Sequence, residues 1–174
     1  MLVIWPLEKN YKMKTLGILV ILLFGLNQFA AKAQSVTMIK SSQISQWKSN
    51  TSDTIYVINF FATWCKPCIA EIPEFEKLGQ VYQGKKVKII LVSNDFKNQI
   101  ETKLVPFIKK NIASNQVFFM DENNPNKWIN LVDENWSGAI PATLIIRGSS
   151  AYSKFFEGKV EYKILNEIVL SLNP

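Results

Sequence analysis

Hydrophobic residues along the chain form segments that alternate between a strand pattern and a helix pattern. Thr54–Phe61 is β-branched and aromatic throughout, which predicts a strand buried on both faces. Apolar residues then recur at helical spacing, which predicts a helix from Pro67 to about Gln83. The buried face of this helix consists of Ile69, Ile72, Phe75, Leu78 and Val81 or Tyr82. Lys88–Ser93 follows as a second buried strand and completes a strand–helix–strand unit.

Three more elements continue this alternation after the second strand. They are a helix over about Asn98–Asn111, a short strand over Gln116–Met120 and a short helix over Asn126–Glu134. The buried face of the longer helix consists of Ile100, Leu104, Phe107 and Ile108. The inward side chains of the shorter helix are Trp128, Leu131 and Val132. The strands therefore stay separated by helices, as parallel pairing requires.

The end of the chain predicts a hairpin followed by a helix. Two strands, Ala142–Arg147 and Ala151–Phe156, flank the turn Gly148-Ser149-Ser150. A final helix over about Val160–Leu172 buries Ile164, Leu165, Ile168 and Leu172. Strand–helix–strand units imply parallel pairing, to which the hairpin adds an antiparallel strand. The predicted fold class is α/β, with a mixed central β-sheet flanked by helices in a single domain.

The first 33 residues predict a targeting signal rather than part of the fold. Leu16–Ala31 is almost continuously apolar, two Lys residues precede it, and Ala31-Lys32-Ala33 has the small residues of a cleavage site. We therefore predict a signal peptide over residues 1–33, with Met13 as an alternative start, and an exported domain over residues 34–174 in the periplasm or cell envelope. An uncleaved membrane anchor is the alternative. A spanning helix needs about 20 apolar residues, and an Asn-Gln pair interrupts this run.

Composition and charge exclude several kinds of chemistry. The chain has no His, so it cannot form a Ser-His-Asp triad, a Cys-His protease site, an HExxH zinc site or a haem site with a His ligand. Of its 20 basic and 14 acidic residues, four Lys and one Glu lie in the first 33 positions, which leaves 16 against 13. These Lys residues are scattered, whereas nucleic-acid binding needs a denser basic stripe. We therefore expect no nucleic-acid partner.

Both cysteines of the chain lie in Trp64-Cys65-Lys66-Pro67-Cys68, between the first strand and the first helix. At a helix N-terminus, unpaired N–H groups and the helix dipole stabilise the thiolate of Cys65, and Lys66 adds a positive charge. Pro67 suits the first helical turn. A three-residue step places Cys68 on the same face as Cys65, within reach of a reversible disulfide. These features predict a dithiol redox centre; a zinc site would need further Cys or His ligands, and none remains.

This motif and its setting resemble the thioredoxin superfamily, and more closely its exported TlpA/ResA-like branch, over most of the predicted mature chain. Phe60–Trp64 is similar to the family's approach to the motif. Asn59 stands where cytoplasmic thioredoxins have a buried Asp and where the exported branch commonly has Asn. Glu71 matches the acidic residue of a WCxPCxxExP pattern. Ala139–Thr143 resembles the loop whose proline, here Pro141, is cis and faces the disulfide.

The resemblance implies a role for each site residue. The Cys65 thiolate attacks a substrate disulfide, and Cys68 then resolves the mixed disulfide. Glu71 is the best substitute for the Asp that thioredoxins use as proton acceptor. Near the disulfide, its charge would raise a cysteine pKa or it would relay a proton to Cys68; an ordinary solvated Glu is the alternative. Asn59 is expected to be a hydrogen-bonded core amide. The predicted substrate-binding residues are Trp64, Lys66, Pro67, Ile140 and Pro141, with the backbone of Ile140 pairing with the substrate chain. Trp64 and Trp136 either line the site or are simply buried.

The two residues between the cysteines bear on the direction of electron flow. Lys66-Pro67 is unlike the Pro-His of the strong oxidant DsbA or the Gly-His of disulfide isomerases. Without a charged His to stabilise the thiolate, a low reduction potential is favoured, although Lys66 partly opposes this. The resemblance therefore implies an exported thiol:disulfide oxidoreductase that reduces envelope proteins, apocytochromes c among the client classes. A membrane partner would supply the electrons, and the Cys65–Cys68 disulfide replaces any cofactor.

Three alternatives to a reductase stay open from the sequence. The first is a disulfide oxidase or isomerase of the same fold with a higher reduction potential. The second is a peroxiredoxin-like peroxidase, but the residues before Cys65 do not supply its Pro-x-x-x-Thr/Ser-x-x-Cys setting. The third is a non-enzymatic binding module in which the disulfide is static, because a fold alone does not guarantee activity.

Overall fold

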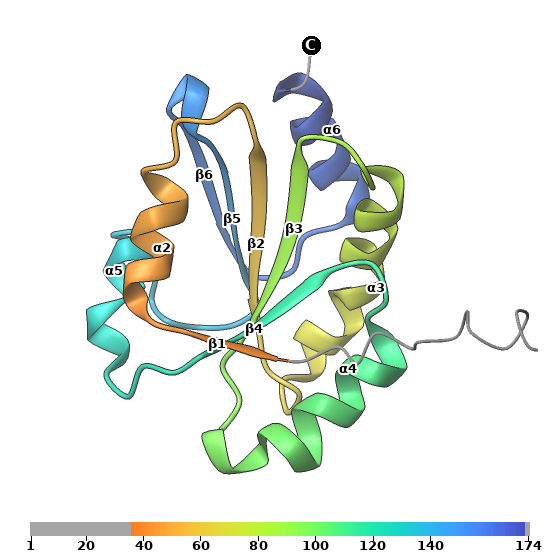
Figure 1. The fold of residues 1–174 in the computed structure, drawn as a ribbon, viewed down its shortest axis with the longest axis vertical. Helices are drawn as coiled ribbons and strands as arrows, with labels where there is room; N and C mark the ends of the chain where they lie inside the picture. The colour runs from red at the N-terminus through yellow and green to blue at the C-terminus, as the bar shows by residue number, and fades with distance from the viewer. Residues whose placement is uncertain (1–35, 173–174) are drawn as a thin grey trace, which may run out of the picture. The chain divides into compact units, whose positions relative to one another are not determined.

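Residues 36–172, which the computed structural model describes, alternate between strands and helices (Figure 1). The strands are β1 (Thr37–Ile39), β2 (Ile55–Phe61), β3 (Val87–Ser93), β4 (Gln116–Met120), β5 (Ala142–Arg147) and β6 (Tyr152–Glu157). The α-helices are α2 (Ser41–Lys48), α3 (Lys66–Val81), α4 (Val105–Asn111), α5 (Ile129–Val132) and α6 (Tyr162–Leu172). The predicted signal peptide and its cleavage site lie outside the described residues. Within those residues, no helix is both long enough and apolar enough to cross a membrane.

The strands of the described region form one six-stranded sheet in the order β1-β4-β3-β2-β5-β6. β2 lies in the middle, where Ile55 is opposite Val87 of the parallel strand β3 and opposite Arg147 of the antiparallel strand β5. β4 is parallel to both β3 and β1, whereas β6 is antiparallel to β5. The prediction of a mixed α/β sheet is therefore confirmed: its parallel part comes from strand–helix–strand units and its antiparallel part from the hairpin.

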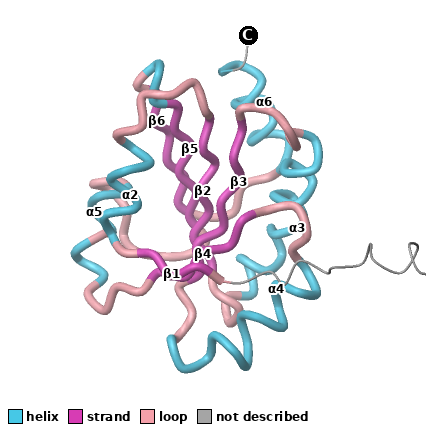
Figure 2. The backbone as a smooth tube through the Cα atoms, in the orientation of Figure 1, coloured by secondary structure: helices cyan, strands magenta, loops and turns pink. Residues whose placement is uncertain are grey.

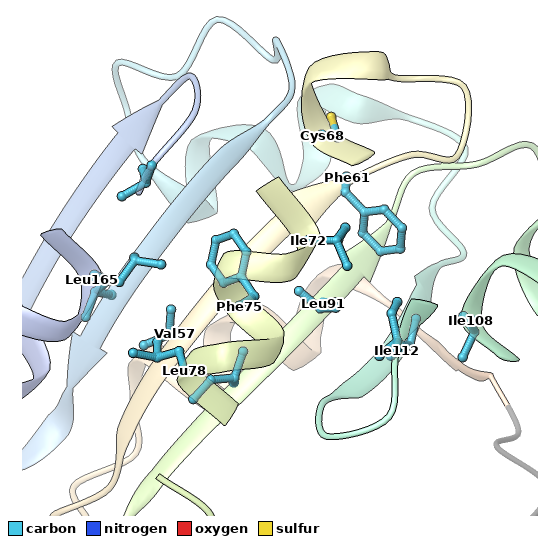
Figure 3. Close-up of a cluster of buried hydrophobic side chains, with 14 of the residues drawn as sticks. Val57, Phe61, Cys68, Ile72, Phe75, Leu78, Leu91, Ile108, Ile112 and Leu165 are labelled. Atoms are coloured by element: carbon cyan, nitrogen blue, oxygen red, sulfur yellow. The ribbon is translucent and has the colours of Figure 1, made fainter. Parts of the chain in front are cut away.

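Helices cover both faces of the sheet, with α2 and α5 on one side and α3, α4 and α6 on the other (Figures 1 and 2). We call these the α2 face and the α3 face. Every residue of β2 is buried, as its sequence, apolar or aromatic at every position but Asn59, predicts. Alternate residues enter different cores: Val57 and Phe61 join the α3 face, and Ile58 and Phe60 join the α2 face. Figure 3 shows the α3 side chains of the first core, among them Phe75, between that helix and the sheet.

The predicted helix over 98–111 is divided into three pieces in the structure. A 3-10 turn at Lys97–Gln99 leads into a π-helical turn at Ile100–Leu104, and only then does α4 begin. Pro106 explains the irregular turn, because it has no N–H to donate to the carbonyl of Thr102, four residues before it. The predicted inward residues Ile100, Leu104 and Ile108 are buried, and Phe107 is half-buried.

Two shorter predictions need correction. In place of the helix over 126–134, a 3-10 turn at Pro125–Lys127 precedes a single turn of α5, and Leu131 is exposed rather than inward. In α6, Ile164 is exposed as well, and Val169 takes its place in the core. The buried stripe of α6 runs through Leu165, Val169 and Leu172, at steps of four and three residues, and Ile164 lies off this stripe.

The structure adds two elements that the sequence pattern did not reveal, β1 and α2. β1 has three residues and forms the outer edge of the sheet beside β4. α2 buries only Ile44 and Trp47, so its apolar residues are too few to produce a clear helical period. Trp47 packs edge-on against Phe118 of β4, with ring centroids 5.6 Å apart. Tertiary contacts rather than amphipathic patterning therefore define this part of the fold.

Candidate active site

Cys65 and Cys68 form a disulfide bond at the N-terminal end of α3, where the sequence predicts it. Cys65 is the N-cap residue of the helix, and the backbone N–H of Cys68 points to Cys65 Sγ at 3.3 Å. Pro67 lies in the first turn, where its missing N–H leaves no intrahelical bond unmade. The helix N-terminus thus directs an unpaired N–H group at the sulfur of Cys65, which stabilises negative charge there once the disulfide is reduced.

The two sulfur-bearing residues differ in accessibility. Cys65 is 6% exposed, whereas Cys68 is fully buried. Figure 3 shows Cys68 at one end of the core that also contains Phe61 and Ile72. After reduction, a partner molecule can reach Cys65 but not Cys68. This difference in exposure is compatible with the predicted roles, in which Cys65 attacks and Cys68 resolves.

The loop before Cys65 is held by residues that follow β3. The backbone N–H of Thr63 donates to Asp95 Oδ1 at 3.0 Å, and the Thr63 hydroxyl donates to the same oxygen at 2.6 Å. The N–H of Asn94 donates to the carbonyl of Phe61 at 2.7 Å. Ser93 completes the arrangement by donating its hydroxyl to Asp95 Oδ2 at 2.8 Å. Asp95 thus ties the segment that carries the disulfide to the end of the neighbouring strand.

Sequence reasoning missed Asp95, although a signal for it exists. Ser93 ends one buried strand and Phe61 ends the other. Because parallel strands bring their carboxyl ends to the same edge of a sheet, residues that follow them become neighbours. An acidic residue two positions after Ser93 was therefore a candidate for contact with the Cys65 loop.

The loop of Pro141 faces the disulfide. The Ile140–Pro141 peptide bond is cis, as predicted, and the carbonyl oxygen of Ile140 lies 3.7 Å from Cys65 Sγ. The N–H of Gly158 donates to the carbonyl of Pro141 at 2.8 Å, which fixes the loop against the end of β6. Residues 75 positions apart in the chain thus meet at the sulfur that is accessible to a partner.

Glu71 is fully buried, so the alternative of a solvated Glu is wrong. Its carboxylate accepts a hydrogen bond from Asn59 Nδ2 at 2.8 Å and another from the Val160 N–H at 3.1 Å. Burial raises the pKa of Glu71; the bonds from Val160 and Asn59 and the charge of Lys159 oppose this rise. Glu71 follows Cys68 by one helical turn, which puts both on the same face of α3.

Asn59 is a buried amide in the core of the α3 face, as predicted. Besides Glu71, its Nδ2 reaches Thr143 Oγ1 at 3.1 Å and the carbonyl of Ala142 at 3.3 Å. Asn59 and Thr143 are partners in the pairing of β2 with β5. The amide therefore links Glu71 to the strand that begins directly after Pro141.

The remaining predicted residues divide between the surface and the core. Trp64, Lys66 and Pro67 are exposed around Cys65. Trp136 is buried instead; its Nε1–H donates to the carbonyl of Ala139 at 2.8 Å, so it supports the Pro141 loop from within. In residues 36–172, no group of three or more His, Cys, Asp or Glu side chains could hold a metal ion.

A mixed sheet with a CxxC disulfide at the start of a helix, opposite a cis-proline loop, defines a thioredoxin-like protein. The resemblance seen in the sequence is confirmed at the level of the fold. The chain belongs to the AhpC/TSA family, whose model matches residues 26–150.

Known relatives are similar to this chain in sequence, and solved structures are similar to it in fold. The thiol-disulfide oxidoreductase ResA of Halalkalibacterium halodurans is 26% identical over 117 residues, which span 67% of this chain and 61% of that protein. A thioredoxin-related protein from Neisseria meningitidis serogroup B has a similar structure, with a TM-score of 0.58 and 23% identity, over 68% of this chain and 84% of that one. A secreted thiol-disulfide isomerase from Corynebacterium glutamicum aligns with a TM-score of 0.54 and 18% identity, over 74% of each chain.

Proposed function

We propose that the protein is an exported thiol:disulfide oxidoreductase that reduces disulfide bonds of client proteins in the periplasm or cell envelope. The observation that carries the proposal is the Cys65–Cys68 disulfide, with the accessible sulfur of Cys65 3.7 Å from the carbonyl of Ile140. A static clip explains this placement poorly, because a loop closed over so few residues contributes little entropic stabilisation.

The reaction begins from the reduced dithiol. The Cys65 thiolate attacks one sulfur of a client disulfide; a Cys65–client disulfide forms, and the other client sulfur leaves as a thiolate. The Cys68 thiolate then attacks Cys65 Sγ, which releases the second client sulfur and closes the Cys65–Cys68 disulfide. Two electrons pass from the protein to the client, and two protons end on the client thiols. A membrane protein with a dithiol is the proposed donor that restores the reduced state.

Glu71 is the proposed acceptor for the proton that Cys68 loses before it attacks. Cys68 is buried and there is no His in the chain, so a proton acceptor must come from within the core. The raised pKa of Glu71 brings the proton affinity of its carboxylate closer to that of a thiol. Asn59 and the Val160 N–H would hold the carboxylate in place during this transfer.

Residues around Cys65 are proposed to hold the client chain. The backbone of Ile140, beside Pro141, would pair with an extended client segment as an added strand does. Trp64, Lys66 and Pro67 form the exposed rim on the other side of the sulfur. A client disulfide lying between these two sides would place one of its sulfur atoms against Cys65 Sγ.

The proposed direction of electron flow is supported by the residues between the cysteines, although Lys66 partly opposes it by stabilising the thiolate. Lys66-Pro67 has no His to stabilise the thiolate form, which favours a low reduction potential and hence a reductant. The predicted signal peptide supports activity outside the cytosol, where disulfides form in client proteins. Apocytochromes c, whose thiols must be reduced before haem attachment, are one proposed class of client.

The reduction potential of the Cys65–Cys68 pair tests this proposal directly. The domain would be equilibrated in defined thiol buffers and the two redox states separated by alkylation and mass. A potential near or below about −250 mV supports a reductant, and one above about −180 mV indicates an oxidase or isomerase instead. Absence of a reversible two-electron transition would favour a binding module with a static disulfide.

The residues before Cys65 argue against a peroxidase. The positions seven and three residues before Cys65 are Ile58 and Ala62, not the Pro and Thr or Ser of a peroxidatic site.

A second experiment tests whether the protein has client proteins. A Cys68→Ser variant should trap client proteins from envelope extracts as mixed disulfides on Cys65. If Cys65 stays reactive toward alkylating reagents and yet captures no client, the assignment as a client reductase is wrong.

A further inference from the structure

Two aromatic side chains stand exposed beside the disulfide. Trp64 is 55% exposed and Phe96 is 61% exposed, and every other aromatic side chain within residues 36–172 is buried or half-buried. Their rings stack, with centroids 6.4 Å apart and planes 28° from parallel. Every other Trp of the described region is buried. Exposed rings of this size leave apolar area in water that a partner can cover.

The two rings come from different loops, and the fold holds those loops together. Trp64 directly precedes Cys65, and Phe96 directly follows Asp95. Asp95 accepts hydrogen bonds from both the N–H and the hydroxyl of Thr63, the residue before Trp64. The backbone next to each ring is therefore anchored by the same buried carboxylate. Because the backbone of both loops is anchored, binding to the rings costs little backbone entropy.

The position of the pair next to Cys65 restricts what can cover it. Any molecule that reacts at the disulfide must bring a sulfur atom to Cys65, one residue from Trp64. For a protein client, the residues that flank its half-cystine then lie over Trp64 and Phe96. Lys66 is exposed beside them, but the rings themselves present an apolar face.

We propose that Phe96, together with Trp64, binds an apolar or aromatic side chain of the client close to its disulfide. Phe96 is thereby a specificity-determining residue, which selects clients by the residues around the half-cystine. The inference rests on the proposed function, since it names the class of client segment that the site prefers. It assigns a role to a residue that neither the CxxC motif nor the Pro141 loop contains.

Short synthetic peptides test the proposal. Each peptide consists of Ser and Gly around a single Cys, which forms a disulfide with cysteamine. In a series of such peptides, one Phe replaces a residue at each of the three positions before and the three positions after the Cys. The dithiol form of the protein reduces the mixed disulfide: the peptide and cysteamine leave as thiols, and the protein ends with the Cys65–Cys68 disulfide. Chromatography of the released peptide thiol gives the second-order rate constant.

We expect at least one of the peptides with Phe to react about three- to tenfold faster than the matching peptide without Phe, as aromatic pairing energies predict. In Phe96→Ser the ratio of the rate constants with and without Phe should fall to about one. Phe96→Tyr, which keeps an aromatic ring, should retain the wild-type ratio. Leu170→Ser is the matched control, because Leu170 is similarly exposed but lies on α6. That variant should keep the wild-type preference.

The outcomes separate this inference from the proposed function. Reduction of all peptides at equal rates would overturn the role of Phe96 and leave the reductase assignment intact. The same holds for a preference that Phe96→Ser does not diminish, or that Leu170→Ser diminishes as much. If the wild-type dithiol reduces none of the peptides, the proposed function fails, and the inference fails with it.

Discussion

The two faces of the sheet differ in what neighbouring residues of one strand place on them. On the α3 face, Asn59 of β2 is hydrogen-bonded to the buried carboxylate of Glu71, below the disulfide. On the α2 face, the next residue, Phe60, lies in an aromatic cluster. Its ring centroid is 4.9 Å from that of Trp136 and 5.6 Å from that of Trp128. A one-residue step along β2 therefore crosses from a core that contains a buried carboxyl group to a core of aromatic and aliphatic side chains.

Both faces bury hydrophobic side chains, but only the α3 face also contains the disulfide and Glu71. A buried carboxyl group is costly in the folded state, because its charged form loses hydration. The aromatic cluster has no such cost and contributes large buried apolar areas. We infer that the α2 face contributes to stability without affecting the disulfide, whereas the α3 face combines a hydrophobic core with the groups proposed to act on the disulfide. The predictions below test this separation.

The largest effect is expected at the disulfide. Cys65→Ser should abolish reduction of a protein disulfide, because the accessible nucleophile is lost. Cys68→Ser should also abolish turnover but should accumulate a mixed disulfide on Cys65. Insulin reduction by the wild type and both variants, followed by non-reducing gels, checks this. Turnover by Cys65→Ser at the wild-type rate would mean that the chemistry lies elsewhere in the molecule.

The next effect tests the aromatic face. Phe60→Ala should lower the free energy of unfolding by about 3–5 kcal/mol, since it removes a fully buried ring that contacts Trp128 and Trp136. The reduction potential of the Cys65–Cys68 pair should stay unchanged. Urea unfolding and a thiol-buffer titration measure the two quantities. A potential that shifts along with stability would show that the two faces are coupled.

A pH-dependent effect is expected on the α3 face. Because the folded pKa of Glu71 is raised, the folded protein keeps its proton at pH values where the unfolded chain has lost it. The free energy of unfolding contributed by Glu71 is therefore present below the usual Glu pKa of 4.5 and falls as pH rises from there through the raised value. Glu71→Gln cannot ionise, so it lacks this decline.

Urea unfolding of the oxidised protein across a pH series measures the difference between Glu71→Gln and the wild type. At low pH the variant should be less stable by about 1–2 kcal/mol, since an amide cannot accept both hydrogen bonds that Glu71 receives. With rising pH the variant should gain on the wild type. Phe60→Ala serves as the control, since its destabilisation should not vary with pH in this way. A constant difference at all pH values would contradict a raised pKa.

The smallest effect is expected at Ile164, a residue that the sequence pattern placed in the core and the structure places at the surface. Ile164→Ser should change the free energy of unfolding by no more than about 0.5 kcal/mol. Leu165→Ser, one residue further along α6, removes a fully buried side chain and should cost several-fold more. If both variants lose the same free energy of unfolding, the buried side of α6 is not the one that contains Leu165.

Much of the fold was predictable because its signals are local. The apolar run that forms β2 and the helical spacing in α3 each depend on neighbouring residues, and both elements lie where the sequence predicts them. The irregular turn before Pro106 was harder to predict, because hydrophobic spacing alone does not indicate a missing N–H group. β1 and α2 were missed because each is short and is defined mainly by contacts with other elements.

By itself, the sequence determined the kind of chemistry. It joins a buried strand to a helix through a CxxC motif, it contains no His, and it places Glu71 one turn after Cys68. Tertiary structure decided which distant groups surround the sulfur atoms: the Ile140 carbonyl near Cys65, the Val160 N–H on Glu71, and the Phe96 ring on Trp64. Spacing along the chain predicts which residues share a helix face or strand. Contacts between separate loops instead depend on strand order, because parallel strands bring their ends together across long connections.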